Sequence, residues 1–140
     1  MQISREGELI LVKIEYGENV KDTILKVIQK EKISSGEVTW GIGMIRNLQV
    51  GYYNGGSYEK ETFSQPLEIV SFHGSIAGNE PLLHIHCSGA SRDHVVHGGH
   101  FFDGIADPLL EVSIRRFDAI KIERRENARS KLMEISLVRP

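Results

Sequence analysis

Residues 82–102 have the sequence LLHIHCSGASRDHVVHGGHFF, in which two strand patterns are separated by a polar turn. Side chains alternate between the two faces of a β-strand, so His84 and His86 project to the same side. Leu83, Ile85 and Cys87 then lie on the opposite face, which we expect to be buried. This strand therefore presents two imidazoles on one side and apolar groups on the other.

Two imidazoles on one strand face make half of a metal site. His100, which follows Gly98 and Gly99 in the next predicted strand, could supply a third nitrogen. Zinc held by three histidines keeps one coordination position open. Convergence of His100 depends on strand pairing, so a set of exposed or hydrogen-bonded histidines without metal stays an open alternative.

Three further residues near this cluster are candidates for supporting roles. His94 and His97 could replace a ligand or contact one from outside the metal shell. Asp103 lies three residues after His100, close enough to orient an imidazole. Its alternative role is to cap the turn before Gly104.

One helix is predicted between Asn19 and Lys32. Its apolar residues follow the spacing i, i+4, i+7, i+8, which places them on one helical face: Val20, Ile24, Val27 and Ile28. Asn19 is the expected N-cap, and Gly36 lies just beyond the expected end.

The remaining sequence is mostly of strand type. Alternation places Val38, Trp40, Ile42 and Met44 on one predicted face, and Asp107-Pro108 is expected to break a strand. Other predicted strands are 8–16, 48–52, 58–63, 67–73, 82–88, 95–102, 110–114, 120–124 and 132–138, with a hairpin turn at 54–56. The sequence predicts a single α+β domain spanning residues 1–140. It has a largely antiparallel sheet of about seven to nine strands and one main helix near the N-terminus.

Composition restricts the classes of function. A net charge of -2 argues against nucleic acid as a general partner, since phosphate binding needs a basic surface. No apolar run is long enough to cross a bilayer, and the first residues lack a signal-peptide pattern, so we expect a cytoplasmic protein with no membrane partner. The single cysteine, Cys87, is expected to be an inert core thiol.

The basic residues concentrate at the end of the chain. Residues 115–140 hold eight Lys/Arg and four Asp/Glu, whereas residues 1–114 hold nine and fifteen. Arg115, Arg116, Arg124 and Arg125 are therefore candidate contacts for an anion or for DNA. The alternative is that they are solvated side chains on exposed strand faces.

Four segments together carry a family resemblance: LEIVSFHGSI at 67–76, LHIH at 83–86, GGHFFDG at 98–104 and LEV at 110–112. In this combination, and over roughly residues 5–123, the chain resembles the plant-and-prokaryote conserved (PPC, or DUF296) domain. The resemblance implies an α+β fold, a homotrimer and, in members with this histidine pattern, a metal held by His84, His86 and His100. Prokaryotic members are usually stand-alone domains described as predicted DNA-binding proteins.

The chain departs from the plant members of that family in two respects. It lacks the Arg-Gly-Arg-Pro core of an AT-hook, the segment that grips the DNA minor groove, and it keeps His100. The first departure disfavours DNA as a partner, and the second favours the metal-binding, prokaryotic type.

Three functions follow as hypotheses. The first is a homotrimer that binds one metal ion, zinc by preference, and a small anionic ligand. The second is a DNA-associated regulator that acts through the assembled trimer and its basic C-terminal quarter. The third is a protein-interaction module with structural histidines. No second catalytic group is recognisable in the sequence, so no reaction is predicted and enzymatic activity stays open.

Overall fold

The computed structural model describes residues 1–138, and within them it contains one helix and nine strands. The strands are β1 (Gln2–Glu6), β2 (Leu9–Ile14), β3 (Gly36–Tyr53), β4 (Tyr58–Phe63), β5 (Leu67–Ile76), β6 (Leu83–Ala90), β7 (Val96–Arg116), β8 (Lys121–Glu126) and β9 (Met133–Val138), and the helix is α1 (Val20–Lys30). The predicted α+β class is confirmed.

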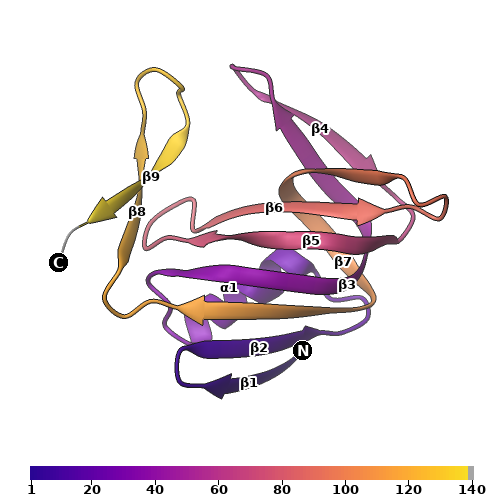
Figure 1. The fold of residues 1–140 in the computed structure, drawn as a ribbon, viewed down its shortest axis with the longest axis horizontal. Helices are drawn as coiled ribbons and strands as arrows, with labels where there is room; N and C mark the ends of the chain where they lie inside the picture. Colours follow the sequence, from indigo (N-terminus) through magenta and orange to yellow (C-terminus); the bar gives the residue numbers. More distant parts are fainter. Residues whose placement is uncertain (139–140) are drawn as a thin grey trace.

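Seven strands form one antiparallel sheet in the order β1-β2-β7-β6-β5-β3-β4, and β7 also pairs with β3. Because β3, β5, β6 and β7 are thus neighbours in a circle, the middle of the sheet closes on itself (Figure 1). Its longest strand, β7, has 21 residues and pairs with β6, β3 and β2 along different parts of its length. Strands β6 and β7, which carry His84, His86 and His100, belong to the closed part.

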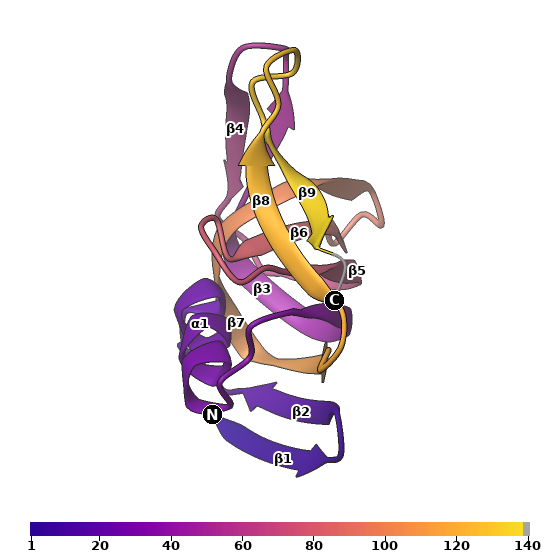
Figure 2. The ribbon, with the colours of Figure 1, turned by 90° about the vertical axis from the view of Figure 1, so that its left-hand side faces the viewer.

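Helix α1 covers one side of the sheet and packs mainly against β7 (Figure 2). Its N-cap is Asn19, as predicted, whose side-chain oxygen accepts a hydrogen bond from the amide of Asp22. The buried face carries Val20, Thr23, Ile24, Val27 and Ile28. The helix therefore covers the core on the side of β7.

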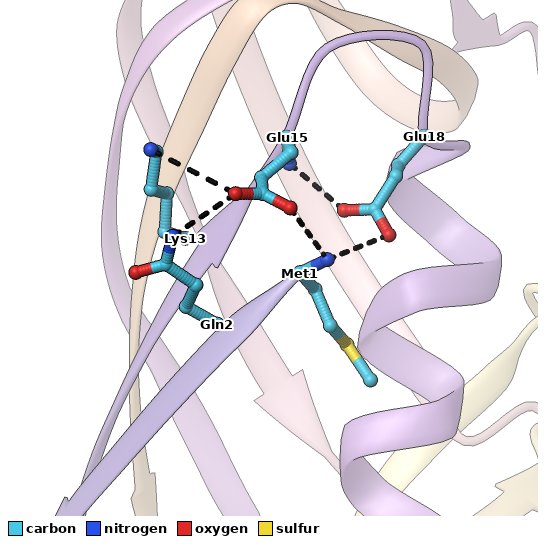
Figure 3. Close-up of polar contacts among 5 residues, drawn as sticks. All are labelled: Met1, Gln2, Lys13, Glu15 and Glu18. Carbon is cyan, nitrogen blue, oxygen red and sulfur yellow. Dashed lines mark hydrogen bonds and ion pairs between the residues drawn. The ribbon is translucent and has the colours of Figure 1, made fainter.

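Strand β1 is a mostly polar edge strand that the sequence pattern does not predict. The amino group of Met1 lies 2.8 Å from a carboxylate oxygen of Glu18 and 3.2 Å from one of Glu15 (Figure 3). These contacts connect the start of β1 to the loop between β2 and α1. Polar strands of this kind lack the alternating apolar pattern by which strands are recognised.

Two predictions about β3 and β7 are wrong. Trp40 and Ile42 do not share the buried face of Val38 but are 44% and 57% exposed, because a register shift lies between Val38 and Trp40. Nor does Asp107-Pro108 end a strand. Gly43 pairs with Leu110 and Ile45 with Ala106, so the proline lies in an irregularity of the continuous strand β7, where a missing amide is tolerated.

Strands β8 and β9 form a separate hairpin that rises from the end of β7 (Figure 1). Asn79 fixes its base, donating to the carbonyl of Arg124 and accepting from the same residue's amide. Near its tip, the hydroxyl of Tyr53 donates to the carbonyl of Ser130 over 2.9 Å. In the described residues, no helix is long and apolar enough to span a membrane.

Candidate metal centre

Strand pairing brings the three predicted histidines together. His84 and His86 lie on β6, and His100 on β7 is the direct register partner of His86. On the other face of β6, Ile85 and Cys87 are buried as predicted. The Nε2 atoms of His84 and His86 are 3.3 Å apart, and each of the three residues offers a ligand atom within 4.8 Å of the others. His100 therefore lies beside His84 and His86, a proximity that the sequence alone could not establish.

Two glycines allow this approach. A Cβ atom at Gly99 would lie 2.7 Å from the carbonyl oxygen of Gly51 on β3, and one at Gly98 would lie 2.6 Å from the carbonyl oxygen of Cys87 on β6. Any larger residue would push β7 away from one neighbour or the other. The Gly98-Gly99 pair thus holds His100 in position by permitting close packing on both sides.

The surroundings of His100 favour its neutral form. Its ring lies between those of Tyr58 and Phe102, each with its centroid 4.8 Å away. Burial, reinforced by the charges of His84 and His86, lowers the pKa of His100 to about 4. Burial also lowers the pKa of His84, with smaller effects from His86 and Arg124. Neutral imidazole is the form that binds metal ions.

The cluster fits a divalent transition metal. Among the described residues, the buried Nδ1 of His100 has no hydrogen-bond partner, which is costly for a polar atom unless a ligand completes it. The 3.3 Å between Nε2 of His84 and of His86 matches the edge of a zinc tetrahedron, about 3.3–3.4 Å for bonds of about 2.0–2.1 Å. Three nitrogen donors suit zinc, nickel, copper or iron better than magnesium or calcium.

The structure does not bring the other predicted supporting residues to this cluster. Asp103 accepts hydrogen bonds from Asn19 and from the amide of Gly104, so it supports the start of α1 and its own turn. The ring of His97 packs on Phe63, with centroids 4.6 Å apart. His94 lies in the turn between β6 and β7 with φ of 65°.

The four candidate arginines divide into two groups. Arg115 pairs with Glu37, Arg116 with Asp118 and Arg125 with Glu123, so their charges are matched locally. Arg124 differs, because it is only 3% exposed and lies beside His84 in the wall of a cavity.

The two larger hollows beside the triad are not indicated by the sequence. An open one of about 560 Å³ includes Glu37, Ser75 and His73, the register partner of His86. The other, of about 690 Å³, lies between the triad and the β8–β9 hairpin. Tyr58 on β4 contacts His100 and lines this second cavity. Such contacts join residues far apart in the chain, so no local pattern could indicate them.

Comparison with known proteins agrees with this fold. The family model described as the Plants and Prokaryotes Conserved (PCC) domain matches residues 1–118. No curated protein sequence matches the chain. The part of the chain beyond the family match includes the β8–β9 hairpin.

Three solved structures illustrate the similarity in fold. A metal-containing protein from Archaeoglobus fulgidus is 25% identical with a TM-score of 0.83, over 97% of this chain and 99% of that one. A plant- and prokaryote-conserved (PPC) protein from Pyrococcus horikoshii is 24% identical with a TM-score of 0.81, over 94% and 92%. A "putative dna binding protein" from Bacteroides thetaiotaomicron is 22% identical with a TM-score of 0.89, over 96% of each chain.

Proposed function

The chain belongs to the Plants and Prokaryotes Conserved (PCC) domain family, and from this premise we propose that it is a cytoplasmic, homotrimeric metal-binding protein. His84, His86 and His100 are the proposed ligands, and zinc is the proposed ion. The observation that carries the proposal is the convergence of three imidazoles, one of which, His100, has a lowered pKa and a buried nitrogen that lacks a partner among the described residues. The metal-containing relative from Archaeoglobus fulgidus supports it.

A metal ion held by three histidines keeps an open position, where it can act as a Lewis acid or bind an anion. The chain's own residues contribute the rest. Tyr58 and Phe102 pack on His100 and exclude water from one side of it, while β6 fixes the spacing of His84 and His86. No reaction is assigned, because the described residues place no carboxylate in the cluster to serve as a general base.

Zinc titration of the EDTA-treated protein tests the proposed ligands. We expect one equivalent to bind per chain in the wild type and none to bind tightly in a His84→Ala/His100→Ala variant. His97→Ala is the matched control, because His97 lies in the same segment of β7 but packs on Phe63. Equal binding by the wild type and the double variant would contradict the proposal and leave a protein-interaction module with structural histidines.

The homotrimer is supported by exposed apolar side chains on the central strands. Trp40 and Ile42 on β3 and Val70 on the neighbouring β5 are all exposed in the single chain, and burying them would be favourable. Light scattering should give about 47 kDa, three times 15.7 kDa. A monomer at micromolar concentration would contradict this part of the proposal.

DNA binding is the second candidate. It is favoured by the "putative dna binding protein" description of the Bacteroides thetaiotaomicron structure and by the basic residues after position 115. The net charge of -2 and the carboxylate partners of Arg115, Arg116 and Arg125 count against it. Anisotropy titration of a labelled duplex would show an affinity that falls steeply with salt if DNA is bound. No binding at low salt would exclude it.

A further inference from the structure

The cavity between the histidine triad and the β8–β9 hairpin has the size of a small-molecule site. Its volume of about 690 Å³ lies within the usual range for ligand pockets of about 300–1,000 Å³. One wall comes from the main sheet and includes His84 and His100, and the other comes from the hairpin. The hairpin lies outside the family match, so this wall belongs to the part of the chain that is not common to the family model.

Arg124 is the most informative residue of this cavity. Its side chain is almost fully buried and donates to the hydroxyl of Ser75 over 2.8 Å, and to the carbonyls of Ser75 and Pro81, each over 3.4 Å. All three acceptors are neutral, and no carboxylate pairs with Arg124 among the described residues. A buried cation without a counter-charge is costly, because it has lost its hydration. Arg124 therefore provides a positive charge that an anion entering the cavity would neutralise.

The charges around the cavity are mostly positive. Lys131 also lines it, and the ammonium of Lys60 lies 3.9 Å from the ring centroid of Phe102. The lining contains one carboxylate, Glu134, which is engaged by the side chains of Asn127 and Ser130. The balance of charge at the cavity is therefore positive.

The rest of the lining is mainly apolar. Leu83 and Phe102 come from the main sheet, and Met133 and Ile135 come from β9. Ile135 is the direct register partner of Arg124 across the β8–β9 ladder, so the two side chains project from the same face of the hairpin. An apolar wall beside a buried guanidinium suits a ligand with an apolar body and one anionic head.

We propose that this cavity binds a small organic oxyanion, with its charged head between Arg124 and the histidine triad and its apolar body against Leu83, Phe102 and Ile135. The inference rests on the proposed function, since an ion on the triad would add positive charge at the same place. The planar fork of arginine matches both carboxylate and phosphate oxygens, so either head satisfies the site.

Calorimetric titration with three probes tests this assignment on the zinc-loaded protein. Benzoate and phenyl phosphate carry the two kinds of head, and benzyl alcohol is a neutral molecule of similar size. We expect at least one of the two anions to bind at least about tenfold more tightly than the alcohol. The tighter anion identifies the head. Binding of neither anion, or equal binding of anion and alcohol, would overturn the proposal.

Two variants locate the binding. Arg124→Gln should lower the affinity for the anion at least about tenfold, since the charge opposite the head is removed. Ile135→Glu should have a similar effect by repulsion, and its exposed position makes it safe for folding. Leu137→Glu is the matched control, because Leu137 is exposed on the same face of β9 but does not line the cavity. Affinity that is unchanged in both Arg124→Gln and Ile135→Glu would overturn the proposal.

The same titrations on zinc-free protein separate this inference from the metal site. Zinc binding without anion binding would overturn the inference and leave the proposed function intact. Conversely, if zinc does not bind to the triad but the metal-free protein binds anion in an Arg124-dependent manner, the cavity assignment holds and the metal proposal fails.

Discussion

His86 on β6 and His100 on β7 are direct partners in an antiparallel ladder, so their backbones are adjacent although fourteen positions separate them in sequence. With His84 two residues before His86 on the same face, this single pairing assembles the triad. The site therefore depends on the β6–β7 register as much as on the histidines themselves.

A substitution that disturbs this register should weaken both fold and site. Gly99→Ala would place a Cβ atom 2.7 Å from the carbonyl oxygen of Gly51, which forces β3 and β7 apart. We expect a loss of about 1–3 kcal/mol in the free energy of unfolding, together with weaker zinc binding. Urea denaturation and zinc titration measure the two effects. Gly56→Ala is the control, because its added Cβ would meet only the Asn54 side chain, 3.9 Å away. Equal unfolding free energies and equal zinc binding in Gly99→Ala and Gly56→Ala would show that the site does not depend on close packing at Gly99.

The stability of the metal-free protein should fall in mild acid. The pKa of His100 is about 4 in the folded chain against an ordinary 6.5, so between these values the unfolded state binds a proton that the folded state does not. His100 therefore causes no loss above pH 6.5 and an increasing loss as the pH falls toward 4. Urea midpoints measured in EDTA from pH 7.5 to 4 should decline, and less steeply in His100→Gln. Identical slopes for the two proteins would refute the assignment.

Cys87 should be unreactive in the folded state. Its side chain is buried beneath the histidine strand, and burial raises the pKa of its thiol to about 12, so little thiolate is present at neutral pH. Ellman's reagent should label the native protein far more slowly than the guanidinium-unfolded protein. Rapid stoichiometric labelling of the native protein would show that the β5–β6–β7 region opens readily.

The contact between Asn19 and Asp103 should matter for stability and not for metal. Asn19→Ala removes both the N-cap of α1 and the bond to Asp103, and should cost about 1 kcal/mol of unfolding free energy. Asp103→Ala should lower the melting temperature while the zinc stoichiometry stays at one. Loss of zinc in Asp103→Ala would instead indicate that Asp103 orients one of the metal-binding imidazoles.

Periodic patterns in the sequence predicted the local parts of this fold. Strand alternation placed His84 and His86 on one face with Ile85 and Cys87 buried behind them, and helical spacing identified α1 with its cap at Asn19. These features depend on neighbouring residues only, so the sequence carries them directly.

The remaining features depend on contacts between distant segments. The register shift that exposes Trp40 arises from pairing with β7. Pro108 is accommodated because it lies between Ala106 and Leu110, the two residues of β7 between which the pairing with β3 is irregular. Likewise, Arg124 meets Ser75 across 49 positions, so its burial follows from how the hairpin docks. A prediction from composition could only count it among the basic residues.

Elemental analysis of untagged protein as purified is the first test of a metal ion held by the three histidines. We expect close to one zinc per chain in the wild type, retained in His97→Ala and lost in His84→Ala/His100→Ala. Wild-type protein that stays folded with no bound transition metal, and takes up none on addition of zinc, would contradict this expectation.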